Sequence, residues 1–127
     1  MLENSDRSPG VVTSDDALHG SEDGITFWRG FDPHEAGTQV FLARALAEPG
    51  TKIPPHVHTA DTVAYLVNGR ALFRTGDDLT EVHELHAGDW LFVPAGVVHV
   101  EETPDDSAAE FLYARDSRGG ETTYFDE

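Results

Sequence analysis

The sequence predicts a single all-β domain, folded as a sandwich or barrel of the jelly-roll class. Short segments rich in β-branched and aromatic residues recur along the chain, which is typical of strands. Turn-forming residues separate these segments at regular intervals, and almost no segment carries a helical period. At 127 residues the chain is long enough for one sizeable core and too short for two.

The expected strands follow from these apolar runs and the turns between them. They cover residues 25–31, 38–47, 62–67, 71–75, 80–86, 89–94, 97–102 and 109–115. The second run contains Ala, Leu and Arg, which favour helix, but its β-branched start and the Glu-Pro-Gly that follows favour a strand. Asn68-Gly69 stands between two apolar runs, and this pair is the strongest short signal for a hairpin turn.

The two ends of the chain differ in composition from the middle. Residues 1–24 are rich in Ser, Asp, Gly and Glu, so we expect a flexible N-terminal arm there. Within the arm, residues 11–13 could pair as an edge strand and residues 15–23 could hold one helical turn. The folded domain is expected over 25–117, followed by a C-terminal tail over 118–127.

Charge and cysteine content exclude several functions. The chain has 24 acidic residues against 8 Lys and Arg, giving a net charge of −16, which would repel nucleic acid and anionic membranes. It has no cysteine, which excludes disulfides, thiolate metal sites and a cysteine nucleophile. No apolar run approaches the roughly 18 residues of a membrane span, and the start lacks a signal-peptide layout. We therefore expect a cytoplasmic protein that binds neither nucleic acid nor membranes.

Three of the seven histidines stand out by their positions. His56 and His58 are two residues apart, so they project from the same face of an extended chain. His99 follows a Pro-Ala-Gly turn. Taken alone, the pair fits either a metal site or exposed strand residues, and His99 fits an ordinary hydrogen-bonded residue. The other histidines are expected in loops, on the surface or, for the last of them, at the rim of the fold: His19, His34, His83 and His86.

Taken together, the spacings resemble the two motifs of the cupin superfamily. The first motif, G-x5-H-x-H-x(3,4)-E-x6-G, is matched by Gly50, His56, His58 and Gly69, with Thr62 at the glutamate position. The second motif, G-x5-P-x-G-x2-H-x3-N, is matched by Gly88, Pro94, Gly96 and His99, with Thr103 at the asparagine position. The resemblance covers residues 50–103. It implies a cupin double-stranded β-helix, a jelly-roll barrel, with a metal held by His56, His58 and His99.

The main departure from the family motif is at Thr62, because the glutamate of that position is usually the fourth metal ligand. A neutral hydroxyl does not readily replace a carboxylate on a divalent ion. Asp61 is adjacent, but it shares strand parity with Val63 and faces away unless a bulge turns it inward. The expected site is therefore three histidines with water in the open positions, and Thr62 and Asp61 are the candidates for a fourth ligand.

The resemblance also implies a chemistry. A site without this glutamate resembles that of the three-histidine iron oxygenases, such as the thiol dioxygenases and acetylacetone dioxygenase. This favours iron and an oxygenase-type enzyme acting on a small chelating organic substrate, with Zn, Ni, Mn and Cu as alternative ions. Two other functions stay open. One is a non-redox isomerase or lyase whose metal acts as a Lewis acid, and the other is a ligand-binding or sensor module without turnover.

Two charged residues are candidate catalytic groups. Arg44 shares the parity of Leu42 and Leu46, so it could point into the barrel and pair with a substrate carboxylate, or lie exposed at an edge. Glu101 shares the parity of His99 and could accept a hydrogen bond from a ligand or act as a base. The aromatic residues expected inside the barrel are Trp28, Phe41, Phe73, Trp90, Phe92, Phe111 and Tyr113.

A homodimer is also expected. A jelly roll of this size leaves an open sheet edge, and an open edge invites pairing. The resembled family contains many dimers, and residues 11–16 could add an edge strand to a second subunit.

Overall fold

The computed structural model describes residues 8–116 and 121–125, and nearly all of its regular structure is strand, which confirms the all-β class. Its elements are β1 (Leu18–Glu22), β2 (Ile25–Arg29), α1 (Pro33–Ala36), β3 (Val40–Ala47), β4 (Lys52–His58), β5 (Thr62–Thr75), the 3-10 helix η1 (Asp77–Leu79), β6 (Glu81–His86), β7 (Trp90–Val93), β8 (His99–Glu102), β9 (Ala109–Asp116) and β10 (Thr122–Tyr124). No helix in the described part of the chain is long and apolar enough to cross a membrane.

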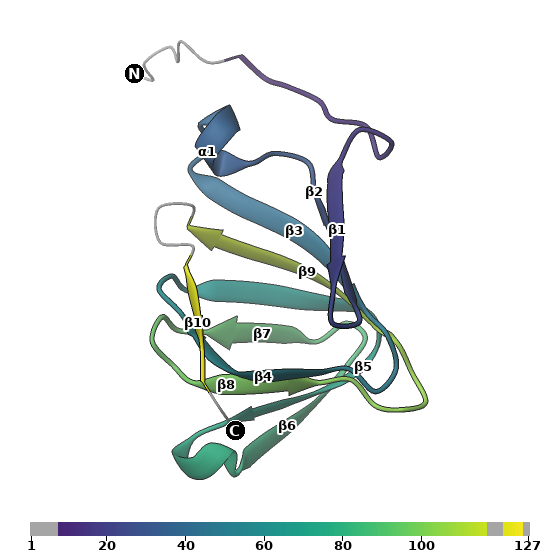
Figure 1. The fold of residues 1–127 in the computed structure, drawn as a ribbon, viewed down its shortest axis with the longest axis vertical. Helices are drawn as coiled ribbons and strands as arrows, with labels where there is room; N and C mark the ends of the chain where they lie inside the picture. Colours follow the sequence, from purple (N-terminus) through teal and green to yellow (C-terminus); the bar gives the residue numbers. More distant parts are fainter. Residues whose placement is uncertain (1–7, 117–120, 126–127) are drawn as a thin grey trace.

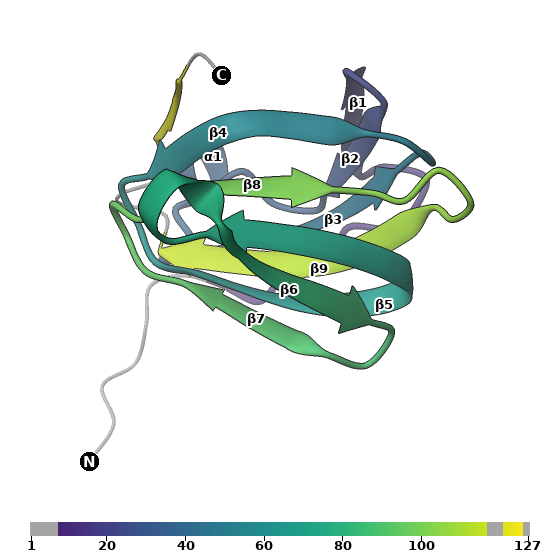
Figure 2. The same ribbon diagram turned by 90° about the horizontal axis from the view of Figure 1, so that it is seen from below.

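Two antiparallel sheets curl around a common interior, and one long strand belongs to both (Figures 1 and 2). In the first sheet, β1, β2, β3, β9, β5 and β7 are neighbours in that order. In the second sheet the order is β6, β5, β8, β4 and β10. The first half of β5 pairs in one sheet and its second half in the other. This arrangement is the jelly-roll barrel that the sequence predicts, and in the central strands β3, β5 and β7 alternate side chains point into it.

The bend in β5 replaces the hairpin turn expected at Asn68-Gly69. The register of β5 with β9 shifts between Leu66 and Asn68, as at a β-bulge. Gly69 has φ +87°, and a Cβ atom there would lie 1.8 Å from the carbonyl oxygen of Ala108. An Asn-Gly pair supplies the positive φ that a bulge needs as readily as the one that a hairpin needs. Here the chain bends into the second sheet instead of turning back.

A second bulge sets the direction of the side chains in β4. Between Ile53 and His56 the chain of β4 advances three residues while β8 advances two. The extra residue falls at Pro54-Pro55, where the ladder is already interrupted because proline has no N–H to donate. As a result Ile53, His56 and His58 all line the same cavity, although strict alternation would have turned Ile53 away from the histidines.

Both ends of the chain contribute strands that were not expected. β1 lies within the stretch expected to be a flexible arm and pairs with β2 along its whole length, whereas residues 11–13 form no strand. The expected helical turn over 15–23 is therefore wrong for the residues of β1. β10 lies within the expected tail and pairs with β4. The remaining parts of these predictions, residues 1–7, 117–120 and 126–127, lie outside the described residues.

The barrel interior is built mainly from small and medium side chains, and three of the expected core aromatics lie outside it. Trp90 is 76% exposed and Phe92 is 59% exposed, because the inward positions of β7 are Leu91 and Val93. Of the other expected aromatics, Phe73 is buried, Phe111 and Tyr113 line the central cavity, and Phe41 packs against the ring of Tyr113. The last, Trp28, also points out of the barrel, against the guanidinium of Arg44, because the inward positions of β2 are Ile25 and Phe27.

Candidate metal centre

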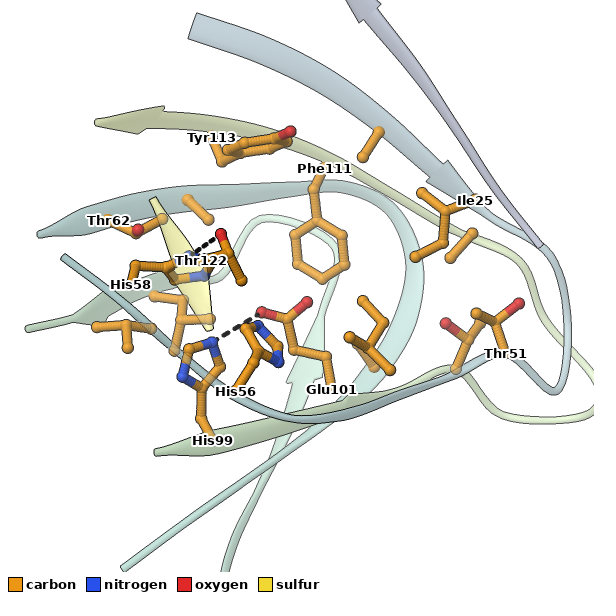
Figure 3. Close-up of a pocket in the computed structure, with 18 of the residues that line it drawn as sticks. Ile25, Thr51, His56, His58, Thr62, His99, Glu101, Phe111, Tyr113 and Thr122 are labelled. Carbon is orange, nitrogen blue, oxygen red and sulfur yellow. Dashed lines mark hydrogen bonds and ion pairs between the residues drawn. The ribbon is translucent and has the colours of Figure 1, made fainter. Parts of the chain in front are cut away.

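Three histidines converge inside the barrel, as the sequence predicts (Figure 3). His56 and His58 come from β4 and His99 from β8, two neighbouring strands in which His56 and His99 are direct partners. One ring nitrogen from each lies within 4.8 Å of the others. All three residues are buried, with exposed fractions of 3%, 7% and 1%.

Hydrogen bonds to the backbone fix the tautomers of two of these rings. His56 Nδ1 lies 2.8 Å from the carbonyl oxygen of Pro54, and His99 Nδ1 lies 3.0 Å from that of Val97. A carbonyl oxygen can only accept, so each Nδ1 carries the hydrogen and donates it. Each Nε2 then presents a lone pair to the cluster. This is the usual way in which a protein orients a ligating histidine.

The third ring reaches the same state through side chains. His58 Nδ1 lies 2.8 Å from Thr122 Oγ1 on β10, and His58 Nε2 lies 3.2 Å from Nη2 of Arg115. A guanidinium can only donate, so Nε2 of His58 is the acceptor and its Nδ1–H donates to the threonine hydroxyl. All three histidines therefore present an Nε2 lone pair, and the unexpected strand β10 supplies one of the three hydrogen bonds.

Burial keeps the imidazoles of His56 and His58 neutral. It is the largest cause that lowers the pKa of His56 and that of His58, which falls to about 3. The Arg115 cation and the two neighbouring histidines lower the pKa of His58 further. Neutral imidazole is the form that binds a metal.

The lone pair of His99 shows that the cluster fits a metal ion. Its Nε2 is buried and has no hydrogen-bond partner among the described residues, and Glu101 Oε1 lies 3.7 Å from it, beyond hydrogen-bond range. A buried polar atom of this kind is rare and calls for a partner. Three convergent imidazoles suit Fe, Zn, Ni and Cu. The donor set therefore indicates a site for one divalent metal.

The two candidates for a fourth ligand separate clearly. Thr62 lines the cavity, and its hydroxyl accepts a hydrogen bond of 2.8 Å from Nε of Arg115. Asp61 points away, and its carboxylate accepts a hydrogen bond of 2.8 Å from the backbone N–H of Ala95. Strand parity predicts this outward direction. The cluster in the described part of the chain therefore contains no carboxylate.

Arg44 does not point into the barrel. It is 47% exposed, its Nε lies 2.6 Å from Glu110, and its guanidinium lies 4.4 Å from the centre of the Trp28 ring. The parity that we assigned to β3 is inverted, because the buried positions are alanines and the larger Leu42 is exposed. Arg44 therefore lies on the outer face of the barrel and does not reach the cavity, where its expected direction would have placed it beside a substrate.

Arg115 points into the barrel, and sequence reasoning missed it. It lies on β9, and its guanidinium contacts His58, Thr62 and the ring of Tyr113, whose centre is 4.9 Å away. A signal was present in the sequence. Arg115 shares the two-residue parity of Phe111 and Tyr113, both of which we expected to point inward.

The histidines form one wall of a cavity of about 260 Å³. Ile25, Phe27 and Phe111 contribute apolar surface to it, and Glu101 lies beside His99, with its side chain 33% exposed (Figure 3). Burial raises the pKa of Tyr113, so its phenol stays protonated. The cavity has the character of a small-ligand site, apolar with a few convergent polar groups.

The remaining histidines lie on other elements. His19 lies exposed on β1, and His34 falls within α1. His83 and His86 lie exposed on β6, where each is close to a glutamate.

Comparison with known proteins gives one family and several similar folds. A family model described as "Cupin domain" matches residues 43–114. An acireductone dioxygenase of Synechococcus sp. (strain RCC307) is 39% identical over 66 residues, which are 48% of this chain and 35% of that protein. The chain thus spans about a third of the length of that relative.

Solved structures with a similar fold include the polyketide cyclase RemF of Streptomyces resistomycificus, at a TM-score of 0.78 and 19% identity over 94% of this chain and 87% of that chain. An oxalate decarboxylase of Bacillus subtilis matches at a TM-score of 0.73 and 19% identity, over 93% of this chain and 33% of that one. An oxalate oxidase matches at 0.67 and 22% identity, over 82% and 56%. At these identities the likeness shows the fold.

Proposed function

Because this chain belongs to the cupin family, we propose that it is a metal-dependent enzyme that acts on a small organic molecule able to chelate the metal. The observation that carries the proposal is the set of three Nε2 lone pairs at the wall of a largely apolar cavity. A catalytic metal keeps positions open for water or substrate, whereas a structural metal is enclosed by protein ligands. Three histidines without a carboxylate leave such positions open.

We favour oxygenase chemistry with iron. The partial similarity to acireductone dioxygenase supports it, and so does the neutral Thr62 at the position where the family motif has a glutamate. The bound metal would supply a Lewis-acidic centre that holds the chelating oxygens of the substrate. Zn, Ni, Mn and Cu are the alternative ions.

The residues of the chain itself would hold and orient the substrate. The apolar wall that includes Phe111 excludes water from the site. The protonated phenol of Tyr113 can donate a hydrogen bond to a substrate oxygen. The carboxylate of Glu101, beside His99, is placed to accept a proton from a substrate carbon or hydroxyl.

Glu101 also favours a second candidate, a non-redox isomerase or lyase. Such an enzyme needs a base next to a metal that polarises a carbonyl group, and the position of Glu101 meets that need. In this reading zinc is the natural ion, because it has no redox chemistry.

Oxygen uptake distinguishes the two candidates. The protein, loaded with Fe(II) under anaerobic conditions, is mixed with small chelating acids and diketones in an oxygen electrode, and the products are analysed. We expect oxygen uptake with at least one compound. If the Glu101 carboxylate accepts the substrate proton, Glu101→Gln should lose this uptake, and the surface control Glu84→Gln should retain it in full. Turnover without oxygen, on zinc-loaded protein, would establish the second candidate. Binding without turnover of any compound would leave a ligand-binding module and contradict both.

A further inference from the structure

We propose that Arg115 is the anion-binding residue of this site. A bound metal would take the Nε2 lone pair of His58, to which Arg115 now donates a hydrogen bond, and so make the guanidinium available to an anion. The inference builds on the proposed function, since it assigns a substrate class to the same cavity: a small organic anion with one oxygen on the metal and a second on the guanidinium. Metal and anion would then bind cooperatively.

The first step is the lack of an anionic partner. Among the described residues, Arg115 donates its hydrogen bonds to the hydroxyl of Thr62 and the imidazole of His58, and both groups are neutral. Three other arginines, by contrast, each form an ion pair with a carboxylate; the pairs are Arg44 with Glu110, Arg70 with Asp106 and Arg74 with Glu102. Glu101 lines the same cavity and attracts the guanidinium, but no ion pair joins the two, so an anion that enters can still pair with Arg115 directly.

The second step is competition for one lone pair. Nη2 of Arg115 and the metal would both use Nε2 of His58, and one imidazole lone pair cannot serve both. When the metal binds, Nη2 loses its acceptor, and its N–H groups become available beside the metal. Nε meanwhile keeps its 2.8 Å hydrogen bond to Thr62, which holds the guanidinium in place.

This competition also explains the hydroxyl at position 62. A glutamate there, as in the family motif, would lie against Arg115 and form an ion pair with it. That pair would neutralise both the fourth ligand and the cation. Thr62 positions the guanidinium without neutralising it, so the positive charges of the metal and Arg115 are both left for the ligand.

The third step is the size and charge of the ligand. The cavity of about 260 Å³ admits only a small molecule. Three neutral imidazoles leave the full charge of a divalent ion, and Arg115 adds another positive charge beside it. A carboxylate or enolate that bridges the two cations is the chemistry that this pair recognises.

The test measures zinc binding and anion binding separately, with redox-inert zinc so that no turnover is needed. Glycolate is the anionic probe and glycolamide its neutral counterpart of similar size, both titrated calorimetrically into metal-free and zinc-loaded protein. Zinc affinity is measured by competition with a chelating dye. We expect zinc to tighten glycolate binding by about tenfold or more, and glycolate to tighten zinc binding by the same factor. Glycolamide should show no such coupling.

The decisive variant is Arg115→Gln, because the two affinities should move in opposite directions. Zinc should bind about tenfold more tightly once the competing donor and its charge are gone, and glycolate should bind about tenfold more weakly or worse. Arg115→Lys keeps the charge without the planar fork and should fall between the two. Arg44→Gln, on the outer surface, should behave as the wild type.

A purely structural role would give a different pattern. If Arg115→Gln weakens zinc and glycolate alike, or leaves glycolate binding unchanged, the proposal is overturned. Thr62→Val tests it again without touching the charge, since it removes the group that holds the guanidinium; unchanged glycolate binding there would also count against it. If zinc and glycolate bind cooperatively but no compound is turned over, the proposed function is contradicted and this inference is not. If only neutral compounds are turned over, this inference is contradicted and the proposed function is not.

Discussion

At the scale of single residues, the centre depends on three buried imidazoles that are oriented by different partners. Two donate from Nδ1 to a carbonyl oxygen two residues earlier in the chain, so any backbone that places them correctly also fixes their tautomers. His58 instead depends on a hydroxyl and a guanidinium from distant parts of the chain. It is therefore the member of the cluster that remote substitutions should affect most.

The lowered pKa of His58 predicts a pH dependence of stability in the metal-free protein. Between its ordinary value of 6.5 and about 3, the unfolded state binds a proton at this residue that the folded state does not. The free energy of unfolding should therefore fall as the pH drops through this window, by up to about 1.4 kcal/mol per pH unit from this group. His58→Gln should show a flatter profile than the wild type in urea titrations from pH 7 to 4. Parallel profiles would contradict the assignment.

At the scale of secondary-structure elements, β10 acts on the centre although none of its residues is a ligand. Thr122 pairs with His58 in the ladder and accepts the hydrogen bond from its Nδ1. Thr122→Val keeps the shape but removes the acceptor, and should lower zinc affinity about 10- to 100-fold. Thr123→Val, one residue along on the same short strand, should leave it unchanged. Equal affinities in the two variants would show that β10 serves only to pair the sheet.

The bend in β5 gives a prediction for folding. Gly69→Ala would place a Cβ atom 1.8 Å from the backbone of Ala108, at a positive φ. Strain and overpacking should together lower the free energy of unfolding by about 2–4 kcal/mol, measured by denaturant titration. Gly20→Ala is the control, since a Cβ there meets nothing within 4 Å. A loss of less than about 0.5 kcal/mol in Gly69→Ala would mean that the bend is easily reshaped.

At the scale of the whole molecule, the outer face of the first sheet predicts a homodimer different from the one expected through the arm. Its exposed apolar residues are neighbours across four strands; they are Leu42, Val63, Trp90, Phe92 and Leu112. None carries a charge, so on a chain of net charge −16 this is a face where two copies can meet without like charges in direct contact. We expect sedimentation to show dimers at micromolar concentration. Phe92→Glu should give monomers and Val82→Glu, on the other sheet, should not; wild-type monomers would remove the prediction.

Sequence reasoning predicts the fold class from the spacing of apolar runs and turns. Strand parity places His56 and His58 on one face, and the resemblance to the cupin motifs adds His99 to them. The predicted direction of a side chain is wrong where it depends on what the sheet packs against. Leu42 and Trp90 are apolar and lie outside, while alanines fill the interior of β3. A prediction from hydrophobicity alone therefore assigns Arg44 to the wrong face of the strand. Bulges add to this, because the shift at Pro54-Pro55 is visible only in the register with β8.

The elements at the two ends could not be predicted for another reason. β1 reads Leu-His-Gly-Ser-Glu and β10 reads Thr-Thr-Tyr, and neither has an apolar alternation that marks a strand. They form because β2 and β4 offer unpaired edges, which is a property of the assembled sheet. Thr122 and its hydrogen bond to His58 were beyond reach for the same reason.

The central claim is that His56, His58 and His99 together bind one divalent metal, and zinc titration tests it most directly. Metal-free protein is titrated with zinc, and the bound ion is counted after equilibrium dialysis. We expect one ion per chain in the wild type and in His83→Ala, and a loss of affinity of about 100-fold or more in each of His56→Ala, His58→Ala and His99→Ala. Undiminished binding in the three cluster variants, or a comparable loss in His83→Ala, would contradict the account.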